Sequence, residues 1–448
     1  MTKDNPLGYE KIGRLLFQYS VPSIVGMTVS AFYNIVDRIF IGNSPDLGTD
    51  GLAGITIAFP VMIITLALGI LFGVGGATLF SLRLGEGKQK EAEYALGNSF
   101  FLLLSVGVIY MIAGQIFLRP LLRAFGASTA VLPYATEYMR TIMFGAVFQM
   151  VSLGFNHFIR ADGSPRDAML SMFLGAGVNI ILDPLFIYVF RWGMTGAALA
   201  TVIAQGCSFI WVISYFRSKR CHHRLRLDLI RPQARIVGRI IPLGLPGFFL
   251  QLANSVLNVT LNRNLQAYGG DIAISGMGII NSLGTILTLP VIGTRQGAQP
   301  IISFNYGAAK YQRVRQTVLM AIGIATVILL IGTLIIRIMP ETLIGLFNQD
   351  PDLLVFGRHA LLTWFLCLPT VGFQIMASSY FQAIGKSAVA TFLTLTRQVI
   401  FLIPALLVFP LFWGLEGLLY AAPFADFFAA IITGLFFTYS IRRLGRDY

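Results

Sequence analysis

Twelve long apolar stretches dominate the sequence and constrain its fold more than any other feature. A helix needs about 20 apolar residues to cross a bilayer. The approximate limits of the stretches are 14–42, 52–83, 94–117, 130–158, 166–190, 194–216, 236–263, 271–304, 314–338, 354–382, 388–410 and 416–440. Backbone polar groups find no water inside a bilayer, so each stretch is expected to be helical. The sequence therefore predicts an all-α polytopic membrane protein with twelve transmembrane helices.

The composition agrees with a membrane protein. Only 12% of the 448 residues are charged, about half of the roughly 25% that is typical of soluble domains. The net charge of +13 lies mostly in the connections between apolar stretches, so we attribute it to topology and lipid headgroups and expect no nucleic-acid partner. Three scattered cysteines indicate neither a metal site nor a disulfide framework. No cofactor is expected, and residues 1–12 lack the features of a cleaved signal peptide.

Lysine and arginine alternate in density from one connection to the next. The termini, the central loop and the even-numbered connections carry 23 of these residues, including Arg160, and the odd-numbered connections carry seven. Cytoplasmic loops are enriched in lysine and arginine. Both termini and the central loop are therefore expected to be cytoplasmic, in the inner or cytoplasmic membrane of a prokaryote.

The second half of the chain repeats the first at an offset of 221–224 residues. The matched motifs are Val21-Pro22 with Leu245-Pro246, Asn34 with Asn258, Arg160-Ala-Asp-Gly163 with Gln382-Ala-Ile-Gly385, and Trp192 with Trp413. We expect a first lobe at residues 1–216, a basic cytoplasmic linker at 217–234 and a second lobe at 235–448. Both lobes would begin on the same side of the membrane, as in transporters built from parallel repeats.

The fifth apolar stretch contains an asparagine and an aspartate four residues apart, Asn179 and Asp183. Residues at this spacing share one helix face, and a carboxyl group deep in a membrane helix usually marks a functional site. The next residue, Pro184, has no N–H and frees the carbonyl of Ile180. This face therefore offers an amide, a carboxyl and a free carbonyl.

Further polar groups occur in other stretches of the first half. Asp37 and Asn34 lie in the first stretch, after Pro22, where a bend is expected. The fourth and sixth stretches contribute Tyr138, Asn156, Thr201 and Gln205. Two acids in one apolar bundle favour a shared proton or a bound cation. The alternatives are that the acids only hold helices together through neutral hydrogen bonds, or that Asp37 faces water at the helix end.

The second half lacks equivalents of both acids, because the matching positions are near Leu261 and Ala405. Its ionisable groups are Arg295, Arg397 and Asp426, and we expect Asp426 to neutralise an arginine or to contact a substrate. The residues expected to line a substrate cavity are Tyr33, Met150, Gln251, Asn258, Arg295 and Asp426.

Nearly the whole chain resembles the multidrug and toxic compound extrusion (MATE) transporters, and within them the prokaryotic DinF/MepA-like branch. The texts that carry the resemblance are Val36-Asp37-Arg-Ile-Phe-Ile-Gly42, Arg160-Ala-x-Gly163 and Asn179-Ile-Ile-Leu-Asp183-Pro184. The resemblance implies a V-shaped pair of lobes that exports amphipathic, mostly cationic compounds in exchange for H⁺ or Na⁺. It also implies an ion-responsive site at Asp37, Tyr138, Asn156, Asn179, Asp183 and Thr201, linked to a bend at Pro22.

Other members, of the NorM type, carry acids in the seventh and tenth helices. This chain has Gln251 in the seventh stretch, and its tenth stretch contains no embedded acid. H⁺ is therefore the favoured coupling ion, with Na⁺ at Asp37, Asn179, Asp183 and Thr201 as the alternative.

The resulting hypothesis is a monomeric, secondary active efflux antiporter for drugs and organic cations, working by alternating access, and not an enzyme. One alternative is a flippase for a lipid-linked or anionic metabolite, for which only Arg295 and Arg397 supply positive charge. A channel would need a continuous polar path, and the clustering of polar groups in one half argues against it.

Overall fold

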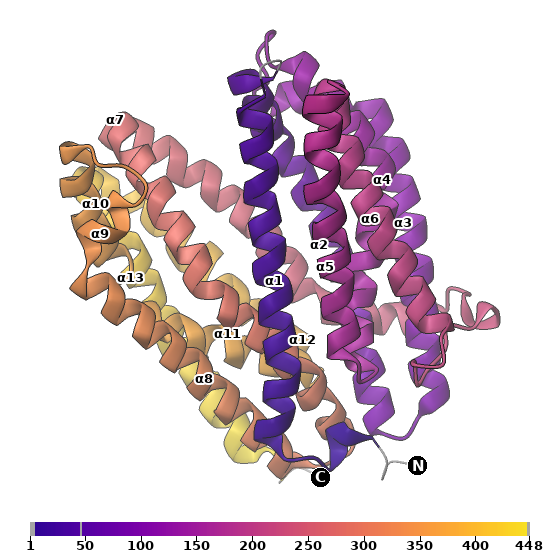
Figure 1. The fold of residues 1–448 in the computed structure, drawn as a ribbon. Helices are drawn as coiled ribbons and strands as arrows, with labels where there is room; N and C mark the ends of the chain where they lie inside the picture. Colours follow the sequence, from indigo (N-terminus) through magenta and orange to yellow (C-terminus); the bar gives the residue numbers. More distant parts are fainter. Residues whose placement is uncertain (1–4, 45–46, 446–448) are drawn as a thin grey trace.

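The computed structural model describes residues 5–44 and 47–445, which fold into two helical lobes (Figure 1). The first lobe comprises η1 (Pro6–Gly8), α1 (Ile12–Gly42), α2 (Gly48–Gly85), α3 (Gln89–Ala124), α4 (Leu132–Ala161), α5 (Pro165–Pro184), the π-helical η2 (Leu185–Val189) and α6 (Gly193–Arg217). After η3 (Leu227–Leu229), the second lobe comprises α7 (Ala234–Gly307), α8 (Tyr311–Ile338), α9 (Pro340–Gly345), α10 (Pro351–Trp364), α11 (Leu368–Ala383), α12 (Ser387–Leu395), the π-helical η4 (Thr396–Leu402) and α13 (Ile403–Arg443). The terminal charges Lys3 and Arg446 lie outside the described residues.

The number of membrane crossings agrees with the sequence once breaks are considered. Within the described ranges, nine helices are long and apolar enough to cross a membrane, and the bent pair α10–α11, which meets at 46°, makes ten. Two of these spans contain a glycine with non-helical backbone, Gly270 (φ 62°) in α7 and Gly414 (φ 56°) in α13. Each break separates two of the predicted stretches, which brings the count to twelve. The predicted all-α, twelve-helix fold is confirmed.

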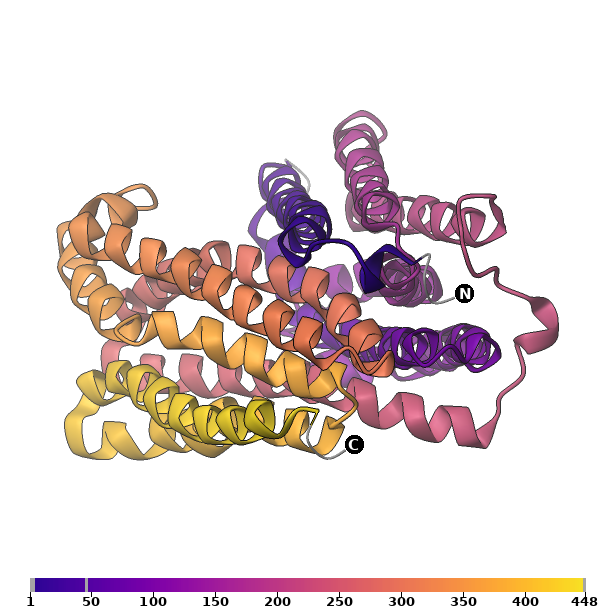
Figure 2. The same cartoon turned by 90° about the horizontal axis from the view of Figure 1, so that it is seen from below.

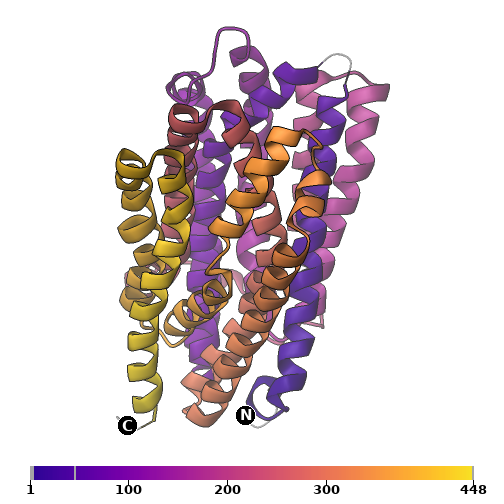
Figure 3. The same cartoon turned by 90° about the vertical axis from the view of Figure 1, so that its left-hand side faces the viewer.

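The two lobes meet at the end of the molecule that carries the termini and diverge toward the other end, which gives a V shape (Figure 1). Seen from the side of the second lobe, its helices lie in front of those of the first (Figure 3). At the closed end, α1 and α2 of the first lobe pack against α7 of the second. We call this contact of α1 and α2 with α7 the seam.

The seam brings backbone against backbone at glycine residues. A Cβ atom added to Gly85 of α2 would lie 2.1 Å from the carbonyl oxygen of Phe304, and one added to Gly307 of α7 would lie 2.1 Å from that of Leu82. The two contacts are reciprocal, since Gly307 follows Gly85 by 222 residues and Phe304 follows Leu82 by the same number. Only glycine permits helices to approach this closely.

The N-terminal segment adds a second tie between the lobes. Arg313 of α8 donates to the carbonyl oxygens of Leu7 (3.1 Å) and Glu10 (2.7 Å), and Asn305 of α7 donates to Leu7 at 2.8 Å. Lys310 donates to the carbonyl of Gly8 at 2.8 Å. The segment that precedes α1 is thus held by the second lobe at the closed end.

The basic linker runs along the outer side of the first lobe before α7 begins (Figure 2). Asp162, at the end of α4, accepts hydrogen bonds from the Tyr215 hydroxyl (2.7 Å), the His222 N–H (2.9 Å) and both the N–H and the ring Nδ1 of His223. Farther along, the Gln233 N–H donates to Asn98 Oδ1 at 2.7 Å. The linker is therefore fixed to the first lobe along its length.

Replacing Gly244 of α7 by alanine is expected to prevent full closure of the seam. The added Cβ would lie 1.8 Å from the backbone carbonyl of Leu71 in α2, and such overpacking costs about 1–3 kcal/mol. Distances measured between spin labels on the two lobes should lengthen at the terminal end. Gly238→Ala, in the same helix but with nothing within 4 Å, serves as the control, and equal distances in both variants would contradict the prediction.

The linker anchor should weaken as pH rises above neutrality. Burial opposes ionisation of Asp162, but hydrogen bonds from His222, His223 and Tyr215 outweigh it and hold the pKa of Asp162 below its usual value. The hydrogen bond with Asp162 raises the pKa of His222, against partial burial. Stabilisation from Asp162 is present above about pH 3.9, and that from His222 is full below about 6.5 and lost as pH rises through its raised pKa.

Hydrogen exchange in residues 218–233 should accordingly be severalfold faster at pH 8 than at pH 6, after correction for intrinsic rates. His222→Gln should remove this difference, whereas His359→Gln should keep it because His359 pairs with Glu416 in the second lobe. A difference that persists in His222→Gln would disprove the role of this histidine.

Candidate functional site

Four helices of the first lobe bring polar side chains together near the end opposite the termini. Asp37 comes from α1, Tyr138 from α4, Asn179 and Asp183 from α5, and Thr201 from α6. Asp183 is fully buried, and Asp37 is 9% exposed. A set of carboxyl, amide and hydroxyl groups is thus enclosed within an otherwise apolar bundle.

Asn179 lies at the centre of the hydrogen bonds in this set. Its Nδ2 donates to Asp183 Oδ1 at 3.2 Å and to Thr201 Oγ1 at 3.4 Å, while the Thr201 hydroxyl donates to the carbonyl of Ala197 at 3.2 Å. The four-residue spacing on α5 places Asn179 and Asp183 on one face. The α-helix ends at Pro184, and the π-helical η2 follows, because proline has no N–H to continue the regular pattern.

The carboxyl groups of Asp37 and Asp183 are close enough to interact electrostatically. Three buried oxygens in this part of the described structure have no hydrogen-bond partner: Asp37 Oδ1, Asp183 Oδ2 and Asn179 Oδ1. Two carboxylates at this range repel each other unless a proton or a cation lies between them. Among the described residues, no group of three or more His, Cys, Asp or Glu side chains is arranged so that it could hold a metal ion. The oxygens present suit H⁺ or a monovalent hard cation such as Na⁺.

Tyr33 belongs beside this acid pair, although the sequence analysis placed it in a substrate cavity. Both Tyr33 and Tyr138 interact electrostatically with Asp37 and Asp183. The signal was present in the sequence, since Tyr33 precedes Asp37 by four residues on one helix. The tyrosines supply hydroxyl groups next to the carboxyl groups.

Other predicted members lie apart from the pair. Asn156 donates at 2.7 Å to the carbonyl of Ala168 and to the hydroxyl of Ser171, which lies roughly 18 Å from Asp183 along α5. Asn34 is exposed and donates to the carbonyl of Ser30 in its own helix. These contacts join or cap helices and do not reach the acids.

The remaining supporting residues have local surroundings of their own. Gln205 of α6 turns its buried, unpartnered Oε1 toward Gly145 of α4. Pro22 lies inside α1, which continues as one helix through it. The bend expected at Pro22 is therefore not a helix break in this conformation.

Two residues expected to line a substrate cavity, Met150 and Asp426, are buried within the lobes in this conformation. Met150 is fully buried in the core of the first lobe. Asp426 is 3% exposed and bound by Arg397, with an Nε–Oδ1 distance of 2.5 Å. Asp426 neutralises an arginine, as one alternative held, but it is not paired with Arg295 in this structure.

The other cavity candidates lie on α7. Gln251 is half-buried, and its Oε1 accepts from Asn254 at 3.4 Å, whereas Asn258 is exposed and donates to the carbonyl of Asn254. Arg295 is half-buried, and its Nε has no hydrogen-bond partner within the described ranges. The positions of these residues in the sequence do not show which of them lacks a hydrogen-bond partner.

Comparison with known proteins places these features in context. The family model described as MatE matches residues 22–185 and 246–407. The multidrug export protein MepA of Staphylococcus aureus (strain MSSA476) is 28% identical over 96% of this chain and 95% of its own length.

Two solved structures superpose closely on this one. An outward-facing multidrug resistance MATE transporter of the MOP superfamily matches with a TM-score of 0.92 and 26% identity, covering 99% of both chains. A MOP superfamily transporter from Pyrococcus furiosus, described by the reverse polarity of its binding pocket, matches with the same TM-score and identity over 99% of this chain and 98% of its own.

Removing Arg397 is expected to destabilise the second lobe by about 3–5 kcal/mol, because Asp426 would remain buried without a counter-charge. Thermal unfolding of Arg397→Gln in detergent measures this effect. The double variant Arg397→Gln/Asp426→Asn should recover most of the stability, since no buried charge is left unpaired. Equal losses in the single and double variants would show that the ion pair is not responsible.

Proposed function

The chain belongs to the MatE family, and from this premise we propose that it is a secondary active antiporter that exports amphipathic compounds in exchange for H⁺. Membership makes the chain a multi-pass membrane transporter and not an enzyme. The observation that carries the proposal is the buried Asp37–Asp183 pair with its unpartnered oxygens. A site of this kind has different charge states with and without the ion, as coupling requires.

The acid pair is connected to the seam through α1. Asp37 lies near one end of α1. Toward the other end, the same helix packs against Gly293 and Gly297 of α7, where an added Cβ would meet the backbone of Ile24 and Ser20. Pro22 lies between Ser20 and Ile24, and a proline at this position lowers the cost of bending α1 there. A change of charge at Asp37 can thus alter the helix that closes the seam.

The mechanism follows from this connection. The seam is closed in the structure, and the lobes diverge at the end where the acid pair lies. Ion binding at the pair would stabilise one arrangement of α1, and substrate binding between the lobes would stabilise the other. Antiport requires only that the two ligands prefer different states. Na⁺ held by Asp37, Asn179, Asp183 and Thr201 is the alternative coupling ion.

The closed seam is proposed to face the cytoplasm, in the inner membrane of a prokaryote. The termini, the linker and the even-numbered connections carry 23 of the 33 lysine and arginine residues. Both ends of the described chain lie at the end where the lobes meet (Figure 1). The structure then corresponds to an outward-facing state, in agreement with its likeness to a transporter solved in that conformation. MepA is a multidrug export protein, and organic cations are the first substrates to test.

Asp183→Asn and Asp37→Asn should each abolish gradient-driven efflux while leaving the protein inserted, because neither variant can exchange the charge of the pair. Purified protein in liposomes, loaded with a fluorescent organic cation, is assayed under an imposed pH gradient and then under a Na⁺ gradient. H⁺ coupling predicts efflux only with the pH gradient.

Asp167→Asn provides a matched control in the same helix, because Asp167 lies at the opposite end of α5 and pairs with exposed Arg220. This variant should transport at the rate of the unmodified protein. Wild-type efflux from Asp183→Asn and Asp37→Asn would refute the proposed coupling site. If only the Na⁺ gradient drives efflux, the coupling ion is Na⁺ and not H⁺.

A further inference from the structure

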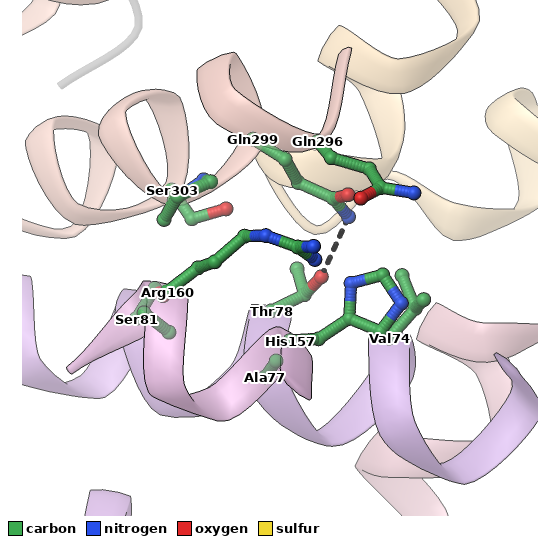
Figure 4. Close-up of a pocket in the computed structure, with 11 residues that line it drawn as sticks. Val74, Ala77, Thr78, Ser81, His157, Arg160, Gln296, Gln299 and Ser303 are labelled. Atoms are coloured by element: carbon green, nitrogen blue, oxygen red, sulfur yellow. Dashed lines mark hydrogen bonds between the residues drawn. The ribbon is translucent and has the colours of Figure 1, made fainter. Parts of the chain in front are cut away.

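A small polar cavity lies in the seam, where α2 and α4 of the first lobe meet α7 of the second (Figure 4). Its volume is about 20 Å³, which is enough for a water molecule or a monatomic ion. Both lobes supply polar walls, including Ser81 and Arg160 from the first and Ser303 from the second. Across the cavity, Gln299 Nε2 donates to Thr78 Oγ1 at 3.0 Å.

Arg160 is buried in this cavity, although its place in the sequence puts it among the charges of the cytoplasmic connections. Its exposure is 2%, and its Nε has no hydrogen-bond partner in the described structure. The one hydrogen bond found for its guanidinium is to the Sδ of Met172 at 3.7 Å. Figure 4 shows the side chain of Arg160 extending along the cavity toward Gln299.

Two hydroxyl groups in the wall of the cavity also lack hydrogen-bond partners. Ser81 Oγ and Ser303 Oγ are buried and unpartnered within the described ranges. The cavity therefore presents three unused donors, two O–H groups and one charged N–H. Gln296 Oε1 is also buried without a partner among the described residues. The two hydroxyl oxygens can accept as well as donate, but the charged N–H of Arg160 can only donate.

The positive charge here has no carboxylate partner in the described part of the chain. Asp162, two residues from Arg160, is fully engaged by Tyr215, His222 and His223. Glu86, at the end of α2, and Glu91, in the first turn of α3, both pair with Arg83. These acids are therefore committed to other bonds.

Arg295 adds a second positive charge in the same region. Its Nε is also buried and unpartnered, and both Arg295 and Arg160 interact electrostatically with His157, which lines the cavity. An uncompensated buried charge is strongly destabilising, and two of the same sign repel each other as well. No acid among the described residues offsets either charge, and a negative ion from solution would offset both.

We propose that Arg160, Ser81 and Ser303 bind a small monovalent anion of the size of chloride in the seam, with Arg295 supplying further positive potential. The three donors suit a ligand that only accepts hydrogen bonds. The cavity is small, and a monatomic anion fits the space between these donors. This site is separate from the acid pair, which lies near the opposite end of the first lobe.

The location gives the anion a conformational effect. Its ligands come from both lobes, so opening the seam separates Ser303 from Arg160 and Ser81. An ion that binds only the closed seam raises the ratio of closed to open molecules by the factor 1 + [anion]/Kd. Chloride would thus favour the conformation seen here without being transported.

The test uses full-length protein in nanodiscs, with fluorescent labels placed across the seam and no substrate present. Chloride replaces gluconate at constant ionic strength and pH. The closed fraction should rise with chloride and saturate, and bromide should act in the same way. Because no transport is measured, failure of the proposed antiport would leave this result unchanged.

Variants assign the effect to the site. Arg160→Gln should lower the apparent affinity for chloride about tenfold or more, the loss expected for one charged hydrogen bond. Arg160→Lys keeps the charge and should retain part of the response. Arg337→Gln, at an exposed position at the end of α8, should respond as the unmodified protein does. If Arg160→Gln does not fold, Ser81→Ala/Ser303→Ala takes its place.

Three results would overturn the proposal. A closed fraction independent of chloride would mean that only water fills the cavity. A chloride response that is unchanged in both Arg160→Gln and Ser81→Ala/Ser303→Ala would mean that chloride acts elsewhere. A crystal soaked in bromide with no anomalous peak between Arg160 and Ser303 would exclude the position.

Discussion

The contact of bare backbone at the closed end of the lobes governs how this molecule can change shape. Gly85 and Gly307 meet carbonyl groups of the opposite lobe at distances that no side chain allows. Backbone surfaces packed so closely cannot slide past each other gradually, because packed interfaces have discrete arrangements. The seam is either closed or separated. Any ligand that controls transport must therefore act by tipping this choice.

Charge distinguishes the two ends of a nearly symmetric fold. At one end of the first lobe, the carboxyl groups of Asp37 and Asp183 share a small space and require a positive charge. At the seam, Arg160 and Arg295 lack acidic partners in the described residues and require a negative one. Since α1 joins the acid pair to the seam, the two requirements act on one equilibrium between closed and open states.

The sequence predicted the features that depend on spacing along one helix. Apolar length gave the twelve spans, and the four-residue spacing placed Asn179 beside Asp183. The glycine breaks at Gly270 and Gly414 fall between predicted stretches. The same spacing rule would have predicted that Tyr33 lies beside Asp37, since it precedes Asp37 by one helical turn.

Features that depend on the neighbouring helix were not predictable from one sequence. Spacing does not show which helix packs on a given face, so Met150 was assigned to a cavity and lies in a core. Asp426 had two arginines to choose from, and only the packing of α13 against η4 selects Arg397. From its sequence position, Arg160 is expected in a cytoplasmic connection. Asp162 beside it is hydrogen-bonded to the linker, and the guanidinium of Arg160 faces the other lobe.

The fixed linker has a consequence for the geometry of opening. Because His222, His223 and Gln233 are bonded to the first lobe, almost no slack chain remains between the lobes. Rotation must then be absorbed at the start of α7, immediately after Gln233. That point acts as a pivot, and the distance from the pivot sets the amplitude. The far tips of α9 and α10 sweep the widest arc, while the residues nearest the pivot hardly move.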